Sequence, residues 1–151
     1  MLIALVVEGR WKMSKIGFDY WQVISHYPKQ IGDLMMALKH APRLPGEDDH
    51  ELHVISAIGK NRIGTIETEV FDVMLEAGFE SDELLDGVHE VVFDKPYQSP
   101  ELKLAKCKEL GITMFFDDRD DVCRLLNKNG IVAMRVTRKD NSTYDLQAER
   151  K

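Results

Sequence analysis

The residues of this chain with the clearest chemical potential form an acidic cluster at 117–121, Asp-Asp-Arg-Asp-Asp, directly after the apolar stretch 112–116. Adjacent carboxylates at the mouth of a buried strand are costly to desolvate unless a cation or phosphate chemistry uses them. Carboxylate oxygens are also the ligands that Mg²⁺ prefers. The cluster therefore predicts cation-dependent or phosphate chemistry. The structural alternative is that Asp117 and Asp118 cap a helix beginning near Val122, a role for which one carboxylate would suffice.

Polar residues also end the other apolar segments. Asp19, Ser56 and the pair Asp94-Lys95 each follow a short apolar run. In parallel sheets, ligands bind beyond the carboxyl ends of the strands, so parallel strands would bring these groups and Asp117 to one edge. The alternatives are that Asp19 is only a turn residue and that Ser56 caps a following turn.

The elements that must position these residues alternate along the chain. Apolar runs predict strands at 2–7, 15–18, 52–55, 88–93, 112–116 and 131–136, and helical spacing predicts helices at 29–40, 65–77, 100–110 and 122–129. Pro28 suits a helix start, and Gly78, Gly111 and Gly130 suit helix ends. Strands alternating with helices imply right-handed crossovers, so we expect a three-layer α/β/α sandwich with a mainly parallel, Rossmann-like sheet.

Composition limits the remaining possibilities. With 151 residues, 44% hydrophobic and 30% charged, the chain fits a single globular domain, with a core at about 15–136, an additional N-terminal strand or arm at 1–14 and a polar tail at 137–151. The net charge of −6 argues against broad nucleic-acid binding through a basic surface. The apolar start is too short for a membrane span and lacks the cations of a signal peptide. We expect a cytoplasmic protein with two reduced cysteines. The oligomeric state stays open, with a homodimer among the options.

The order of these residues resembles the haloacid dehalogenase-like hydrolases. Residues 15–24, Lys-Ile-Gly-Phe-Asp-Tyr-Trp-Gln-Val-Ile, look like the first motif of that family, in which a hydrophobic strand runs into Asp-x-Asp-Gly. Residues 52–56, Leu-His-Val-Ile-Ser, look like the second motif, Lys95-Pro96 like the third and residues 115–121 like the fourth. Each motif is weak alone, but all of them in the right order are fairly specific. The resemblance spans 15–136.

The resemblance implies a phosphohydrolase that acts through an aspartyl-phosphate intermediate. Asp19 would be the nucleophile, because a carboxylate that attacks phosphorus splits one hard displacement into easier steps. Mg²⁺ would be held by Asp19 and Asp118, with Asp117 or Asp121 in support.

The same resemblance implies which residues contact the substrate. Lys95 would neutralise the phosphoryl oxygens, and the Ser56 hydroxyl would donate a hydrogen bond to one of them. Lys103 is the rival for the lysine role; we favour Lys95 because it follows a strand and precedes a proline. Trp21 and Arg119 complete the expected substrate-binding set. The substrate would be a phosphorylated small molecule or a nucleotide in an open site, since the short segments after Asp19 and Ser56 leave little room for a cap domain.

The first motif departs from the family pattern. Trp21 stands where the family's phosphatases carry a general acid, and Gln22 stands where they carry a glycine. A positioned proton donor accelerates such reactions roughly 10²–10⁴-fold, so weak turnover, a changed reaction and a catalytically silent binding or regulatory module are all alternatives. In a second register, Val6 and Glu8 would occupy the first-motif positions, but that register lacks the nucleophile. We therefore prefer the register of Asp19.

Overall fold

The computed structural model describes residues 14–41, 45 and 49–138 of the chain. Its centre is a sheet of five strands in the order β3-β2-β1-β4-β5, and every neighbouring pair is parallel. The strands are β1 (Lys15–Phe18), β2 (Glu51–Gly59), β3 (Gly87–Phe93), β4 (Met114–Asp117) and β5 (Val132–Arg135). This order is that of a doubly wound Rossmann-like sheet, with the chain reversing its direction of travel across the sheet beside β1.

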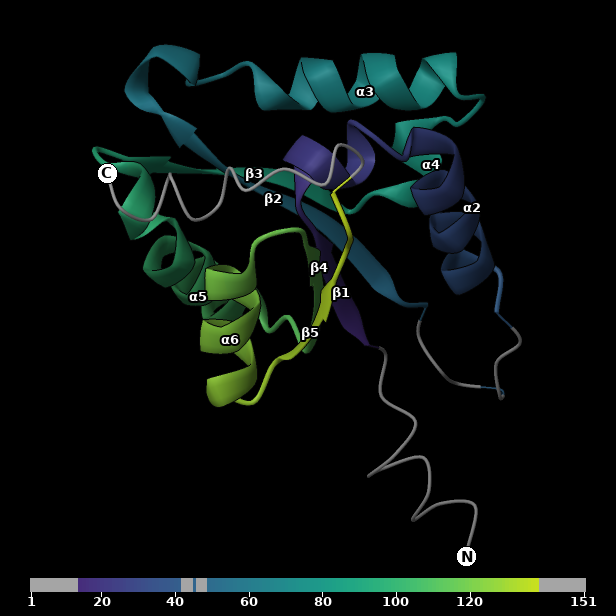
Figure 1. The fold of residues 1–151 in the computed structure, drawn as a ribbon. Coiled ribbons are helices and arrows are strands. Elements are labelled where there is room, and N and C mark those ends of the chain that lie inside the picture. Colours follow the sequence, from purple (N-terminus) through teal and green to yellow (C-terminus); the bar gives the residue numbers. More distant parts are fainter. Residues whose placement is uncertain (1–13, 42–44, 46–48, 139–151) are drawn as a thin grey trace, which may run out of the picture.

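Helices cover both faces of the sheet (Figure 1). The helices are α2 (Pro28–Lys39), α3 (Ile66–Glu76), the short α4 (Ser81–Leu84), α5 (Ser99–Leu110) and α6 (Asp120–Lys128). The first three pack together on one face, and α5 and α6 pack together on the other. The predicted three-layer α/β/α architecture is therefore confirmed, and the sheet is parallel throughout the described residues.

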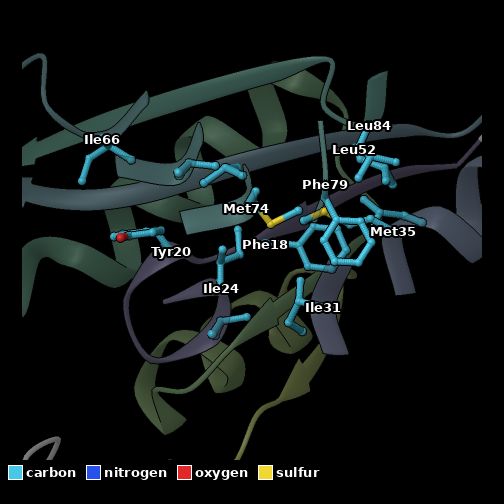
Figure 2. Close-up of a cluster of buried hydrophobic side chains, with 14 of the residues drawn as sticks. Phe18, Tyr20, Ile24, Ile31, Met35, Leu52, Ile66, Met74, Phe79 and Leu84 are labelled. Atoms are coloured by element: carbon cyan, nitrogen blue, oxygen red, sulfur yellow. The ribbon is translucent and has the colours of Figure 1, made fainter. Parts of the chain in front are cut away.

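One apolar core lies between the sheet and the face formed by α2, α3 and α4 (Figure 2). Phe18 and Leu52 from the sheet meet Met35 of α2 and Met74 of α3 there, and none of these side chains is accessible to solvent. Gly32 lets the ring of Phe79 lie against α2, since a Cβ atom at this position would come within 2.3 Å of the ring. Close packing of this kind fixes α2 against the segment that joins α3 to α4.

A second apolar core lies under α5 and α6. Phe115 of β4 is fully buried there with Leu104 of α5 and Leu126 of α6. Its ring lies over Gly17 of β1, where a Cβ atom would be 2.4 Å from the ring. A glycine at this position therefore lets a large aromatic ring pack across two neighbouring strands.

The predicted elements agree with the structure within a few residues, apart from two segments. Strand β2 runs to Gly59, well beyond the predicted end at residue 55, and α4 was not predicted. The predicted strand 2–7, the alternative register at Val6 and Glu8, and the tail beyond residue 138 lie outside the described residues. Both cysteines are buried free thiols. Over the described ranges, the model contains no helix with the length and apolarity needed to cross a membrane.

Candidate functional site

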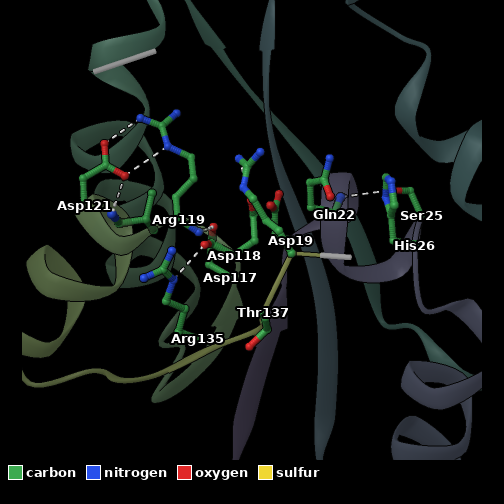
Figure 3. A network of polar contacts seen from close by, with 12 residues as sticks. Asp19, Gln22, Ser25, His26, Asp117, Asp118, Arg119, Asp121, Arg135 and Thr137 are labelled. Carbon is green, nitrogen blue, oxygen red and sulfur yellow. Dashed lines mark hydrogen bonds and ion pairs between the residues drawn. The ribbon is translucent and has the colours of Figure 1, made fainter. Parts of the chain in front are cut away.

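Three carboxylates meet at the carboxyl edge of the sheet (Figure 3). Asp19 follows β1, Asp117 ends β4, and Asp118 comes next in the chain. The two strands are neighbours, and the Asp19 backbone N–H donates a 2.9 Å hydrogen bond to the Phe116 carbonyl, so the ends of the strands lie in register. Each side chain contributes one carboxylate oxygen, and these three oxygens all lie within 4.8 Å of one another. All three residues are buried.

Two cations reach this cluster from other elements. The Lys103 side chain of α5 is only 3% exposed, and its Nζ lies 2.6 Å from Asp117 Oδ2 and 3.0 Å from Asp19 Oδ1. Nη2 of Arg138 lies 2.8 Å from Asp118 Oδ2, although the orientation of the two groups does not make a hydrogen bond to that oxygen. Three carboxylates against two cations leave the ionised cluster with one excess negative charge.

The pKa values reflect this crowding. Burial and the neighbouring Asp117 carboxylate raise the pKa of Asp19 well above its usual value, although Lys103 opposes the shift. Burial and Asp117 likewise raise the pKa of Asp118 to about 6. Burial alone would lower the pKa of Lys103, but the carboxylates of Asp117 and Asp19 outweigh it and raise that pKa. Lys103 therefore stays cationic, and the carboxylates are short of positive charge.

The donor set fits a hard divalent cation. Carboxylate oxygens are the ligands that Mg²⁺ selects, and Asp19, Asp117 and Asp118 could each supply one. Asp118 Oδ2 is buried and lies 2.8 Å from Arg138 Nη2, so a bound cation would share this oxygen with the guanidinium. A dication would also compensate the excess negative charge of the cluster.

The turn after Asp19 has a backbone conformation that side chains rarely adopt. Gln22 has φ of 67° and ψ of −8°, in the left-handed region that favours glycine. The Ser25 hydroxyl accepts a hydrogen bond from the Gln22 N–H, and Asp19 Oδ1 accepts one from the Tyr20 N–H. The chain thus makes the tight turn without glycine, at a cost of about 1–2 kcal/mol. Strain held in this way is common beside functional groups.

A cavity of about 370 Å³ opens above the carboxylates. Its floor includes Asp19, Asp118 and Lys103, and one wall is formed by Trp21 with Arg62. The described residues that line it are Asp19, Trp21, Gln22, Ala57, Ile58, Gly59, Arg62, Phe93, Pro96, Ser99, Lys103, Asp118, Arg119 and Arg138. A volume of this size suits a small molecule.

The structure brings some of the predicted site residues together. Asp19, Asp117 and Asp118 form the buried cluster, and Trp21 and Arg119 line the cavity beside it. Convergence of parallel strand ends accounts for this grouping.

Other predicted residues lie elsewhere. Ser56 lies within β2, fully buried with an unpartnered hydroxyl, and does not line the cavity, because the strand continues to Gly59 before it reaches the edge. Lys95 is exposed outside the cavity, and Lys103 takes the place beside the carboxylates. Asp121 accepts hydrogen bonds from Arg119 and from the Val122 N–H, so its carboxylate stands at the start of α6 rather than in the cluster.

Sequence reasoning missed several residues of the cavity. Arg138 was assigned to the polar tail, yet it lies against Asp118 because residues 136–138 cross the edge of the sheet. The Val136 N–H donates to the Asp117 carbonyl, and the Tyr27 hydroxyl donates to the Thr137 carbonyl, both at 2.8 Å. The Ser99 hydroxyl and Gln22 Oε1 are buried without partners at the cavity. Only Ser99 carried a sequence signal, since it precedes Lys103 by one helical turn.

Comparisons with known proteins do not assign the chain to a family. No protein-family model matches it, and no curated protein matches it. One solved structure that it resembles is described as a predicted HAD-like family hydrolase from Porphyromonas gingivalis. That chain is 13% identical, the match covers 89% of the present chain and 96% of the other, and the TM-score is 0.44. Similarity of this degree establishes no activity, so functional conclusions depend on the site itself.

Proposed function

We propose that this chain is a Mg²⁺-dependent phosphohydrolase of the haloacid dehalogenase-like type, with Asp19 as the nucleophile. The observation that carries the proposal is the meeting of Asp19 with Asp117, Asp118 and Lys103 at the carboxyl edge of a parallel sheet. This arrangement combines a nucleophilic carboxylate, a set of oxygen ligands and a fixed cation at the mouth of a cavity. Those are the groups that phosphoryl transfer through a carboxylate needs.

The chain's own residues would have separable roles. An Asp19 oxygen forms a bond to phosphorus while the bond to the leaving oxygen breaks. The Lys103 ammonium holds Asp19 in place and compensates the charge that develops on the phosphoryl oxygens. The hydroxyl of Ser99, one turn before Lys103, is placed to donate to one of those oxygens. Bound Mg²⁺, held by Asp19, Asp117 and Asp118, would supply further compensation of negative charge.

The site is open to bulky phosphorylated ligands. The connection after β1 is a single turn leading into α2, and the connection after β2 is a short turn leading into α3. Neither connection carries a separate cap domain, so we propose the capless type for this chain. Phosphorylated small molecules and nucleotides would both reach the carboxylates.

The test is hydrolysis of an aryl phosphate with and without Mg²⁺, in wild type, Asp19→Asn and Asp33→Asn. Asp33 is an exposed residue of α2, so its substitution controls for general effects of losing a carboxylate. We expect metal-dependent turnover that is lost in Asp19→Asn and kept in Asp33→Asn. Equal turnover in Asp19→Asn and wild type would exclude Asp19 as the nucleophile.

Trp21 favours a second candidate, a catalytically silent module that binds a phosphorylated ligand. The residue is 41% exposed beside Asp19, where a proton donor would accelerate departure of an alkoxide. The double substitution Trp21→Asp and Gln22→Gly distinguishes the candidates. A steep gain in phosphatase activity would show that only the acid and the relaxed turn are missing. Absence of turnover in both this variant and wild type, with ligand binding retained, would favour the silent module.

A further inference from the structure

Among the residues that the structure describes, the cavity lining provides no independent proton donor for a leaving group. Among its described lining residues the ionisable groups are two carboxylates, one lysine and three arginines, and no histidine, glutamate, cysteine or tyrosine is present. Asp19 would be occupied by the reaction itself, and Asp118 by a cation. The Lys103 ammonium is held by Asp117 Oδ2 at 2.6 Å and by Asp19 Oδ1 at 3.0 Å, which assigns it to the attacking carboxylate and the phosphoryl oxygens instead of the leaving oxygen. A leaving group would therefore have to depart as an anion, without receiving a proton from the protein.

The absence of a proton donor favours phosphoryl compounds whose leaving group is stable as an anion. An alkoxide is about as basic as hydroxide, so departure of an alcohol depends on protonation. A phosphate monoester has a second pKa of about 6 and is stable as the departing anion at neutral pH. Phosphoric anhydrides thus lose little when a general acid is absent, whereas alkyl phosphate esters lose roughly 10²–10⁴-fold.

The side chains in the wall of the cavity favour a ligand that carries a flat ring. The Trp21 indole is 41% exposed at the cavity, and the Arg62 guanidinium carbon lies 5.1 Å from the centre of its ring. Phe93 and Pro96 line the same cavity. The Tyr20 ring meets the indole in an edge contact, at 4.9 Å between ring centres. An exposed indole is a surface on which a further flat ring can pack, and base stacking strengthens binding about 5- to 150-fold.

The cations around the cavity suit a ligand with more than one phosphate. Arg62 is paired with Glu69, Arg119 with Asp121 and Arg138 with Asp118. Each guanidinium keeps its positive charge when it is paired with a carboxylate. Together with Lys103 they place four cations along the lining. Such cations can bind the phosphate of the leaving group, which takes up negative charge when the bond to the bridging oxygen breaks.

We propose, building on the proposed function, that the substrate class of this site is a nucleoside 5′-diphosphate or triphosphate. An Asp19 oxygen forms a bond to the terminal phosphorus, the bond from that phosphorus to the bridging oxygen breaks, and the electron pair leaves with the bridging oxygen. The nucleotide departs with one phosphate fewer and without a proton. Water then attacks the phosphorus of the aspartyl phosphate, the Asp19 carboxylate is released, and the water's two protons leave on inorganic dihydrogen phosphate.

The first test compares ADP with AMP, together with a series of aryl phosphates whose phenols differ in acidity, all in Mg²⁺. We expect hydrolysis of ADP to exceed that of AMP by at least about 100-fold, and aryl phosphate rates to rise steeply as the phenol becomes more acidic. In Trp21→Asp, the dependence on phenol acidity should become shallow and AMP hydrolysis should rise. AMP hydrolysed by wild type as fast as ADP would overturn the inference while leaving the phosphohydrolase intact.

A second test reads out the ring contact without turnover. In the Asp19→Asn protein, binding of ADP should quench the fluorescence of Trp21, and pyrophosphate should bind about 5- to 150-fold more weakly than ADP. Trp21→Phe in the same background should remove the quenching but keep the preference for ADP, whereas Trp21→Ala should remove both. Equal affinity for pyrophosphate and ADP would overturn the assignment of the ring site. Absence of hydrolysis with every phosphate tested would instead defeat the proposed function on which the inference depends.

Discussion

Replacing Asp118 by asparagine should stabilise the metal-free protein. The Asp118 carboxylate is buried beside Asp117, and these two causes raise its pKa from the ordinary value of 3.8 to about 6. A rise of this size corresponds to on the order of 3 kcal/mol of unfavourable free energy for the ionised form in the folded state. Asparagine has a similar shape and cannot ionise, so it avoids this cost, which is the net cost after the opposing attraction of Arg138 and Lys103.

The sign of the pH dependence follows from proton binding. Between about pH 4 and pH 6 the unfolded chain holds fewer protons at Asp118 than the folded chain does, so the contribution of this group to stability falls as pH rises. The contribution is intact at pH values below the pKa that Asp118 has in the unfolded chain. It is fully lost above the pKa that Asp118 has in the folded chain. The advantage of Asp118→Asn should therefore be absent near pH 4, grow through this window and reach its full size above about pH 6.

The assay is urea unfolding of wild type and Asp118→Asn in EDTA across that pH range. Thermal unfolding at neutral pH gives a second readout. There we expect the variant to have a midpoint temperature about 6–12 °C higher than that of wild type, because each kcal/mol shifts the midpoint by roughly 2–4 °C in a chain of this size. Asp33→Asn, at an exposed position, should change stability by less than about 0.5 kcal/mol. Added Mg²⁺ should stabilise wild type more than Asp118→Asn. A variant no more stable than wild type in EDTA at neutral pH, or a difference that does not change with pH, would refute this reasoning.

Three further substitutions probe the same edge of the sheet. Lys103→Met should lower the free energy of unfolding, measured in urea, by about 3–5 kcal/mol because it leaves buried carboxylates uncompensated. Lys95→Met, at an exposed position, should lower it by less than about 0.5 kcal/mol, and equal effects would contradict the placement of Lys103. Gln22→Gly should stabilise the protein by roughly 0.5–1 kcal/mol because glycine adopts the positive φ at this position without strain. Gln30→Gly, in helix α2, should destabilise the protein by a similar amount. If both substitutions changed the stability in the same direction, strain at Gln22 would be ruled out. Gly17→Ala should cost about 1–3 kcal/mol because its methyl group would collide with a buried ring, and thermal unfolding measures this; a neutral result would mean that the ring moves aside easily.

Local sequence signals were enough to predict most of the fold. Apolar runs marked the strands, and Gly111, which follows α5 with φ of 77°, marked a helix end that favours glycine. The length of β2 could not be read in the same way. Its second half is held by pairing with β3, from Ser56 opposite Glu90 to Gly59 opposite Phe93, and this pairing joins segments distant in sequence. The end of the strand was therefore placed too early.

The same distinction separates the predicted and missed parts of the site. Asp19 and Asp117 were predictable because each directly follows or ends an apolar strand, and adjacent parallel strands bring their ends together. Lys103 reaches the cluster only because α5 packs across the sheet and directs this side of the helix toward its edge. Arg138 depends on the path of the chain after β5, which no local pattern determines.

The electrostatics of the cluster link metal binding to the ionisation of the nucleophile. Asp19 must be ionised to attack phosphorus, yet burial and Asp117 raise its pKa, and the cation of Lys103 does not offset them. A divalent cation among the carboxylates would lower the pKa values of Asp19 and Asp118 together, so binding should release protons. The share released by Asp118 should be large below about pH 6 and smaller above it. Calorimetric titration with Mg²⁺ in buffers of different ionisation enthalpy measures this release, and Asp118→Asn should reduce it. Metal binding that releases no protons near pH 5 would mean that the cation binds without contacting these carboxylates, and the assignment of the metal ligands would fail.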